Sequence, residues 1–592
     1  MVSTQFKSRA FIGAFPGCRR VVFSIFLTRT MTAMTAQPLS SDGLSRENRL
    51  PGLLLGLCLF ISVVGLFDHD LWTPDEPREA TIALEMSRSG QWLVPHLAGE
   101  PFVEKPPLSY VVWALFLRVF GGWLGPTIAL RLSLAVLGLL SLGVTYLLAR
   151  RLYGAHSAGW ATAILATMPG FVHVTHWLLV DNALLLFCAA TAWALAEAYV
   201  GGRYSFLGLA GLFAAGAFLC KGLIGPAVIG LAGLGFFAPW AIEQARALKA
   251  GGCPDWRRWG AWHLAGLLIF LGICGAWAAA FRTAAGPDLF REWWHSNHVG
   301  RFSGQAVNLG HINPNPFYYL GVLPLYALTW LPLFGLGAWR LVGLLRQRRF
   351  SPATLVPLVW GLGGLLLFSL PATKREIYLI VLMPAWAMIA ANPLELKLPR
   401  WCGVWLACMG WIFAVCVLSA SGPALWFALD GTVERLLQAL FVLIWAGAGL
   451  AMFLRRSRTI SSRYLAITIV FYIVVLSIAC PLLDGAFRKG YGRNFREFAD
   501  GLLELPEVRP ALWAPDETVR AGLYYYGQRT FAIVRKAEEA EKILAGAHAD
   551  YNAVIACHKP GKNGPPKAIA GGIVLLEVRL RERRLQLIGA KQ

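Results

Sequence analysis

The sequence predicts an all-α polytopic membrane protein of about thirteen transmembrane helices with a small α/β domain at its C-terminal end. Of its 592 residues, 56% are hydrophobic and only 15% are charged, and 24 are tryptophan. One water-soluble core cannot bury that much apolar surface, so the bilayer must be the main solvent. Arginine clusters separate the apolar runs, whereas the last hundred residues are polar and mixed.

Residues 1–50 are predicted to be a cytoplasmic N-terminal extension. Basic residues flank two short apolar stretches there, and no convincing small-residue cleavage site follows. We therefore expect the first apolar run to be retained as a helix rather than removed as a signal peptide. Met1, Met31 and Met34 are alternative first residues of this extension.

Residues 51–484 are predicted to form the transmembrane domain. A span needs about 20 apolar residues. The run 108–120 is too short to span, and we predict a helix that lies at the membrane interface. The thirteen predicted spans are 51–67, 126–149, 157–175, 178–199, 204–220, 222–240, 262–281, 317–339, 353–371, 376–393, 401–420, 436–454 and 464–484.

The distribution of charge predicts the orientation. With a cytoplasmic N-terminus, the four basic clusters at 150–151, 246–258, 340–349 and 455–458 all fall inside, as the positive-inside rule requires. The loop 68–107, on the opposite side, carries eight acidic residues and three basic ones. We therefore expect an extracytoplasmic loop, and we read the net charge of +21 as membrane orientation rather than nucleic-acid binding.

Residues 485–592 are predicted to be an extracytoplasmic accessory domain. Alternating patterns favour strands at 511–513, 553–557 and 573–579 and a helix at 517–526. No nucleophile, metal cluster or phosphate loop is evident in this sequence. The cysteines beside apolar runs are expected to be small core residues rather than disulfide partners; they are Cys58, Cys188, Cys220, Cys274, Cys402, Cys408, Cys416 and Cys480.

A first group of candidate site residues lies in the acidic loop. Asp75 and Glu76 stand between two prolines directly after the first span, where a carboxylate could act as general base. The alternative is an acidic helix start, because Asp and Glu favour a helix N-terminus. Glu104 and Lys105 precede two prolines at interface depth, where an ammonium could meet a lipid phosphate. Lys105 could equally be a snorkelling anchor.

A second group lies at outer helix ends. Asp181 lies three residues into an apolar run that is otherwise free of charge, which is costly unless the carboxylate is paired or lines an aqueous cavity. The segment 291–301 mixes tryptophan, histidine, Asn297 and Arg301, and suits either a sugar phosphate or an aromatic membrane belt. Lys374 and Arg375 break the positive-inside trend and therefore indicate an anion site, and Lys221 gives a weaker hint of the same kind.

Six segments resemble the bacterial branch of the protein O-mannosyltransferase superfamily, which includes the aminoarabinose transferases of lipid A. The most distinctive is DEPREATIALEMSRSGQWLVPHLAGEPFVEKPPLSYVVWALFLRVFG at 75–121. Five further segments follow in the order that the family has: RLSLAVLGLLSLGVTYLLARRLYG, HVTHWLLVDNALLLF, CKGLIGP, NHVGRF and TKREIYLIVLMPAWAMIAA. The resemblance covers residues 51–391. Many relatives place an arginine near the position of Asp181, where this chain has His176-Trp-Leu-Leu-Val.

The resemblance implies a GT-C fold and an inverting transfer of sugar from a polyprenyl-phosphate carrier at the outer face of the bacterial inner membrane. It implies catalytic roles for Asp75, Glu76 and Asp181, and contact with the donor phosphate by Lys105, Arg301, Lys374 and Tyr378. Arg78, Glu104, Asn297, Arg375 and Lys221 are then expected to bind substrate. No cofactor is expected, although a divalent metal stays open.

The acceptor is expected to be lipid A or another glycolipid or glycan, with membrane lipids around the enzyme and no nucleic acid. A protein O-glycosyltransferase is an alternative. A transporter or flippase of lipid-linked solutes is another, but a coupled carrier should bury ionisable residues at mid-bilayer. No ionisable residue lies at the centre of the predicted spans 353–371, 401–420 and 464–484.

Overall fold

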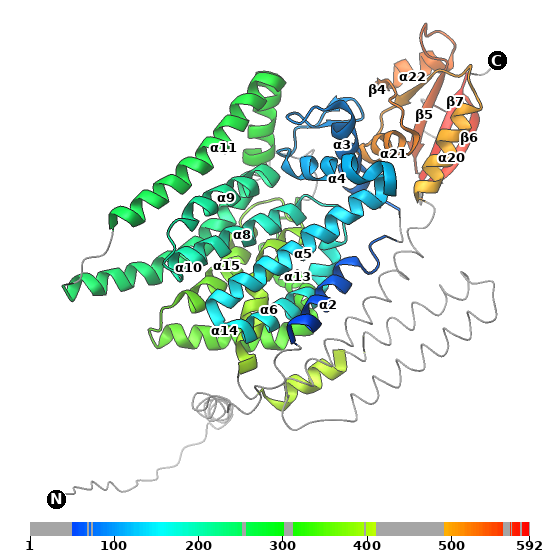
Figure 1. Cartoon of the computed structure of the whole chain (residues 1–592). Coiled ribbons are helices and arrows are strands. Elements are labelled where there is room, and N and C mark those ends of the chain that lie inside the picture. Colours follow the sequence, from blue (N-terminus) through cyan, green and yellow to red (C-terminus); the bar gives the residue numbers. More distant parts are fainter. Residues whose placement is uncertain are drawn as a thin grey trace, which may run out of the picture.

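The computed structural model describes residues 50–67, 70–72, 75–251, 256–300, 312–395, 398–409, 491–559, 571–580 and 583–590, together with 303, 412 and 569. Its main body is a bundle of helices (Figure 1). The bundle contains α2 (Leu50–Val63), α5 (Pro126–Tyr153), α6 (Ala155–Thr167), α7 (Pro169–Thr175), α8 (Asp181–Tyr199), α9 (Phe206–Lys221), α10 (Ile224–Lys249), α11 (Trp256–Arg291), α13 (Tyr318–Ala327), α14 (Leu331–Arg346), α15 (Pro352–Ser369) and α16 (Met383–Ala391).

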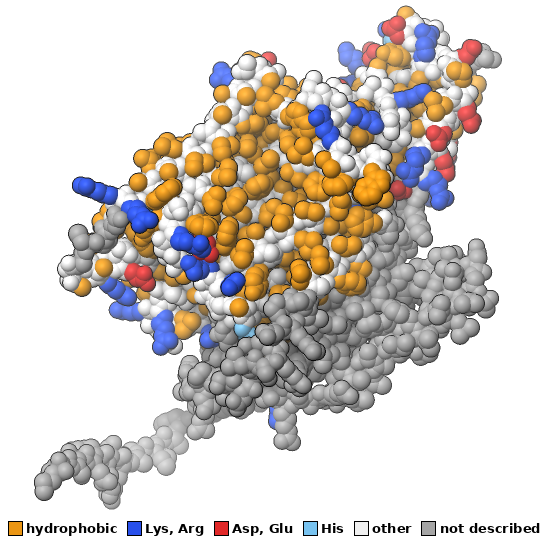
Figure 2. Space-filling model, viewed as in Figure 1, with side chains coloured by type: hydrophobic (Ala, Val, Ile, Leu, Met, Phe, Trp, Pro, Cys, Tyr) orange, Lys and Arg blue, Asp and Glu red, His pale blue; other side chains and the backbone are white. Residues whose placement is uncertain are grey.

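Seven helical segments of the described chain are long and apolar enough to cross a membrane: Pro126–Tyr153, Asp181–Tyr199, Ile224–Lys249, Trp256–Gly300, Tyr318–Arg346, Pro352–Ser369 and Glu376–Leu394. Each corresponds to a predicted span. Figure 2 shows hydrophobic side chains covering the visible face of the bundle, with charged side chains mainly at its lower margin and on the C-terminal domain. This distribution is that of a protein whose middle faces lipid.

The remaining predicted spans have mixed outcomes. α2 and α9 form where predicted but are shorter than a full span. The predicted span 157–175 is divided into α6 and α7, because the backbone is extended at Met168 and Pro169 starts a new helix. The span 401–420 begins as a helix over 400–409, and its remainder, with 436–454 and 464–484, lies outside the described residues. The count of thirteen stays a prediction.

A smaller layer lies over one end of the bundle. It consists of α3 (Asp75–Ser89), the hairpin of β1 (His96–Leu97) and β2 (Glu100–Pro101), and α4 (Leu108–Leu124). α4 is a separate apolar helix where the sequence predicts one, and it buries Tyr110 and Trp113 against α3 and the bundle. Gly125, with a φ of 83°, separates α4 from α5.

The C-terminal domain is a five-stranded sheet flanked by helices. The strand order is β4 (Ile533–Val534), β3 (Pro510–Trp513), β5 (Ala553–His558), β7 (Arg583–Gly589) and β6 (Ile573–Leu580). β3 runs parallel to β4 and β5, and the other pairs are antiparallel. The helices are α20 (Tyr491–Leu503), α21 (Glu517–Gly527) and α22 (Ala537–Leu544).

This domain confirms the four elements predicted from its sequence and adds others. β4 has only two residues, which is too short to give an alternating pattern. β7 begins with two arginines and includes the buried Gln586, so its polar residues hide the strand. The expected core role of the cysteines is confirmed for Cys58, Cys188, Cys220, Cys274 and Cys402, which are free and buried, and Cys408 is partly buried. Cys416 and Cys480 lie outside the described residues.

Candidate active site between the first loop and the helical bundle

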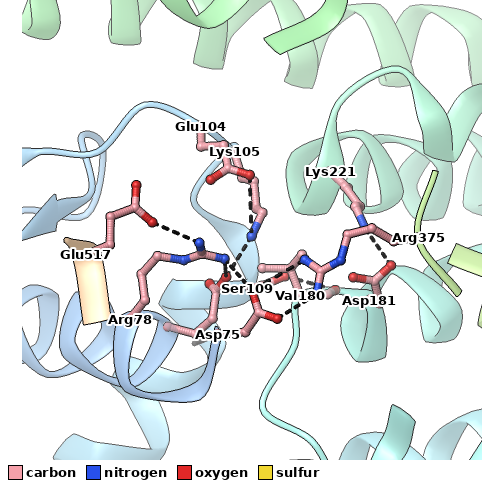
Figure 3. A network of polar contacts seen from close by, with 11 residues as sticks. Asp75, Arg78, Glu104, Lys105, Ser109, Val180, Asp181, Lys221, Arg375 and Glu517 are labelled. Atoms are coloured by element: carbon pink, nitrogen blue, oxygen red, sulfur yellow. Dashed lines mark hydrogen bonds and ion pairs between the residues drawn. The ribbon is translucent and has the colours of Figure 1, made fainter. Parts of the chain in front are cut away.

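Charged side chains from five segments of the chain meet where the small layer lies on the bundle (Figure 3). In that view Asp75 and Lys105 lie between Arg78 on one side and Arg375 and Asp181 on the other. The contributing segments are α3, the loop before α4, the start of α8, the end of α9 and the loop after α15. Most of the predicted site residues are therefore brought together.

Asp75 is at the centre of this cluster, and only 2% of it is exposed. Its Oδ1 accepts a hydrogen bond from Arg78 Nη2 at 2.8 Å, and its Oδ2 accepts one from Arg375 Nη2 at 2.6 Å. Burial alone would raise the pKa of Asp75, but the hydrogen bond from Arg375 and the charges of Arg78, Arg375 and Lys105 lower it to about 2. Asp75 is therefore an ionised carboxylate held by two arginines.

Asp75 is also the first residue of α3, so it does stand at a helix start, as the alternative interpretation expects. A helix-start carboxylate needs no partner from another element. Asp75 has one, because Arg375 reaches it from a loop 300 residues away in sequence. Its position at the helix start and its place in the cluster are compatible.

Glu79, which was not among the predicted site residues, joins Arg78 to Lys105. Its fully buried carboxylate lies 2.6 Å from Lys105 Nζ and 3.1 Å from Arg78 Nη2. Glu104, the neighbour of Lys105, is 4.0 Å from the same ammonium. The signal that could have identified Glu79 is its spacing of four from Asp75, which places both carboxylates on one face of α3.

Asp181 and Lys221 form the second part of the site. Lys221 Nζ donates to Asp181 Oδ1 at 2.5 Å, and it also lies over the Tyr378 ring at 4.2 Å from the centroid. Asp181 is 2% exposed. Lys221, from the end of α9, therefore supplies the charge partner that the segment before Asp181 lacks.

Glu76 occupies a different position from its neighbour Asp75. It is fully buried, and its carboxylate accepts hydrogen bonds from Arg131 in α5, from the Trp72 amide at 2.8 Å and from the Leu178 amide at 2.9 Å. Four donors saturate the two oxygens when both Arg131 nitrogens are counted. This geometry suits a residue that joins α3 to the bundle, and the catalytic role expected of Glu76 stays a prediction. A single arginine inside the apolar run 126–149 was the available signal for its partner.

Lys374 and Asn297, two further predicted residues, lie at the margin of this cluster. Lys374 Nζ donates to the carbonyl oxygens of Asn313 at 2.8 Å and Pro371 at 2.7 Å, so it joins its own loop to the segment before α13 rather than to Asp75. Asn297, in the π-helix η2 (Glu292–Gly300), donates from Nδ2 to the Val103 carbonyl at 3.4 Å. Arg301 lies outside the described residues. Of the two cations in that loop, Arg375 rather than Lys374 therefore faces Asp75, and the phosphate contact expected of Lys374 stays a prediction.

The arrangement offers alternating charge rather than a metal cage. Among the described residues, no group of three or more His, Cys, Asp or Glu side chains is placed to hold a metal ion. The four cations are Arg78, Lys105, Lys221 and Arg375, and each faces a carboxylate. An anionic ligand can take over part of these contacts without leaving a cation unpaired.

Comparisons with known proteins identify the family of this chain. Residues 104–250 match the family described as dolichyl-phosphate-mannose-protein mannosyltransferase. The undecaprenyl phosphate-alpha-4-amino-4-deoxy-L-arabinose arabinosyl transferase of Pseudomonas aeruginosa strain PAO1 is 30% identical over 452 residues, which are 74% of this chain and 77% of the relative. The chain belongs to this arabinosyl transferase family. The corresponding Pseudomonas fluorescens Pf-5 transferase is 29% identical and covers 59% of this chain and 60% of its own length.

A solved structure confirms the fold of this arabinosyl transferase family member. ArnT from Cupriavidus metallidurans bound to undecaprenyl phosphate superposes with a TM-score of 0.68 at 23% identity, over 92% of this chain and 98% of ArnT. The apo structure of the same protein superposes with a TM-score of 0.66. The predicted GT-C architecture is therefore confirmed, and the chain is a polytopic membrane glycosyltransferase.

Proposed function

We propose that this glycosyltransferase moves 4-amino-4-deoxy-L-arabinose, or a closely related sugar, from undecaprenyl phosphate to lipid A. The names of the arabinosyl transferase relatives and the undecaprenyl phosphate bound to ArnT support the donor class. The observation that carries the proposal is the buried Asp75 carboxylate held between Arg78 and Arg375, beside Lys105.

The proposed reaction is a direct displacement at the anomeric carbon. The acceptor oxygen attacks that carbon from the face opposite the carrier, and the bond to the phosphate oxygen breaks with inversion. The electron pair stays on undecaprenyl phosphate, which gains negative charge in the transition state. Lys105, Arg375 and Lys221 stabilise that charge as preorganised cations, and Arg301 is the fourth candidate.

Asp75 has a positioning role in this proposal. An efficient general base has a pKa near the working pH, whereas the pKa of Asp75 is about 2. A hydroxyl acceptor would need a stronger base. A phosphate acceptor of lipid A is already ionised and needs none, so the low pKa of Asp75 favours it over a protein hydroxyl.

We also propose the bacterial inner membrane as the location, with the site on the outer face. The basic clusters at 150–151, 246–258, 340–349 and 455–458 of the sequence support this orientation through the positive-inside rule. In this scheme the small layer and the C-terminal domain are extracytoplasmic.

The test combines a purified assay with lipid analysis. The purified protein is incubated with undecaprenyl-phosphate aminoarabinose and lipid A, and the lipids of a deletion strain are weighed by mass spectrometry. We expect sugar transfer in vitro and loss of one glycosyl mass from lipid A in the strain. Unchanged lipids with altered glycoproteins would show a protein acceptor, and carrier movement without transfer would show a flippase.

A further inference from the structure

The C-terminal domain contacts the candidate active site through one side chain. α21 lies against α3, next to the start of that helix (Figure 1). Glu517, the first residue of α21, accepts a hydrogen bond through Oε2 from Arg78 Nη1 at 2.9 Å (Figure 3). Nothing in the sequence of this domain indicates such a role, because the two residues are 439 positions apart.

Arg78 uses the two ends of its guanidinium differently. Nη2 donates to Asp75 at 2.8 Å and to Glu79 at 3.1 Å, whereas Nη1 donates to Glu517. A guanidinium group that is hydrogen-bonded through one terminal nitrogen can still rotate, whereas one that is hydrogen-bonded through both terminal nitrogens is held in one orientation. Glu517 therefore holds the second end of the Arg78 guanidinium, whose carbon also lies 5.7 Å from the centre of the Phe102 ring.

The orientation of Arg78 is transmitted to the groups that the proposed reaction uses. Arg78 contacts Asp75 directly, and it shares the Glu79 carboxylate with Lys105. If Arg78 rotated, the carboxylates of Asp75 and Glu79 would each lose a hydrogen-bond donor. Lys105, which is paired with Glu79, would then change its position together with that carboxylate. Small displacements of such groups reduce turnover strongly because catalysis depends on near-attack geometry.

Docking of the domain does not depend on Glu517. The Thr81 hydroxyl donates to the Ala521 carbonyl at 2.9 Å, and the Tyr525 and Thr127 hydroxyls are 3.1 Å apart. Arg520 donates to the Leu97 carbonyl at 2.6 Å and pairs with Glu100 at 2.9 Å. Ala521 and Tyr525 also belong to the buried cluster beneath α3 and α4. Removing Glu517 should leave the domain in place.

We infer that Glu517 is a positioning residue of the transferase: the C-terminal domain orients Arg78 through it, and so sets the geometry of Asp75 and Lys105. The inference rests on the proposed function. The Glu517 side chain is 50% exposed, so its ion pair with Arg78 contributes little to stability. Its contribution is to the geometry of the site.

The test compares Glu517→Ala and Glu517→Gln with a matched control. Glu538→Ala removes an exposed first-turn carboxylate from α22 of the same domain, so helix-dipole effects are alike. We expect Glu517→Ala to lower kcat about five- to tenfold with little change in KM for the donor. Gln keeps an acceptor oxygen and should retain more than half of the turnover. The thermal midpoint should be unchanged in all three variants.

Hydrogen exchange gives a readout that needs no turnover. We expect Glu517→Ala to speed exchange in residues 75–89 relative to Glu538→Ala. Equal kcat in the two variants, a raised KM with normal kcat, undocking of the domain, or unchanged exchange would overturn the inference. If the wild type transfers no sugar, the proposed function fails, and the exchange measurement still decides on the positioning of Arg78.

Discussion

At the scale of single residues, neighbours in sequence take different tasks. Asp75 and Glu76 are adjacent, yet one faces Arg78 and Arg375 in the polar cluster and the other is enclosed with Arg131. Successive residues of a helix point about 100° apart, so they meet different surroundings. Lys374 and Arg375 differ in the same way, since one holds carbonyl oxygens and the other holds Asp75.

The first prediction concerns the charge of Asp75. Asp75→Asn should lower transfer roughly a hundredfold, because two arginines lose their common carboxylate. The folded pKa of about 2 lies below the ordinary 3.8, so ionised Asp75 stabilises the fold above about pH 4. This stabilisation is lost as the pH falls toward 2.

Thermal unfolding of the wild type and Asp75→Asn at several pH values measures this effect. We expect a constant difference in midpoint from about pH 7 to pH 4 and a smaller difference below. A carboxylate whose folded pKa equals its unfolded value would give no pH-dependent difference between the two proteins, and that result would contradict the depressed pKa of Asp75.

The second prediction concerns Lys105. Lys105→Ala should reduce transfer by on the order of a hundredfold or more, because an ammonium beside the leaving phosphate is lost. The protein should still insert and fold. Lys542→Ala, an exposed lysine of α22, is the control and should transfer normally. Near-normal transfer by Lys105→Ala from the purified donor would remove Lys105 from the site.

At the scale of helices and loops, buried ion pairs and close glycine contacts hold the layers together. The Glu76–Arg131 pair joins α3 to α5, and both side chains are at most 1% exposed. Breaking a buried pair leaves one charge uncompensated, which costs about 3–5 kcal/mol. This pair fixes the layer that carries Asp75.

The third prediction follows from that pair. Arg131→Met should lower the thermal midpoint and the yield of folded protein strongly, because Glu76 remains buried without its cation. The double variant Glu76→Leu with Arg131→Met should recover part of the loss. Recovery should be incomplete, since the Trp72 and Leu178 amides also lose their acceptor. Equal midpoints for Arg131→Met and the wild type would contradict the structural role.

The fourth prediction concerns the contact between α9 and α11. A Cβ on Gly266 would lie 2.4 Å from the Leu207 carbonyl oxygen, whereas a Cβ on Gly272 of the same helix meets nothing within 4 Å. Gly266→Ala should therefore destabilise the protein by about 1–3 kcal/mol. Gly272→Ala should be neutral. Thermal unfolding in detergent compares them, and equal midpoints would argue against this packing.

At the scale of the whole molecule, the protein has a lipid-facing bundle of helices, and the small layer of α3, β1, β2 and α4 and the C-terminal domain lie at one end of it. The proposed orientation places that end outside the cytoplasm. The cytoplasm then faces the basic residues at the end of α10 and the start of α11, which include Lys249 and Arg257.

The fifth prediction tests this orientation. An impermeant maleimide added to intact spheroplasts should label Lys542→Cys in α22 and leave Lys249→Cys in α10 unlabelled. Permeabilised cells should label both, and the wild type gives the background from its own cysteines. Labelling of Lys249→Cys in sealed spheroplasts would reverse the topology.

The sequence by itself determined the membrane class, the positions of the seven described helical segments that are long and apolar enough to cross a membrane, and four elements of the C-terminal domain. It also indicated the segments that form the site, through a resemblance carried by contiguous residues. These features are local, because hydropathy and alternation are read over windows of ten to twenty residues. The strands β4 and β7 were not predicted because short or polar elements leave no such pattern. The break at Met168 was not predicted because the apolar run continues through it, although Pro169 marks the start of the new helix.

Only the tertiary structure decided which charges pair. Asp75 meets Arg375 across 300 positions, Arg78 meets Glu517 across 439, and Glu76 meets Arg131 across 55. A one-dimensional pattern shows that a buried charge needs a partner, but it does not show which one. The packing of helices sets those distances, so it alone places Glu76 beside Arg131 and Asp75 between Arg78 and Arg375, and it brings the C-terminal domain to the site.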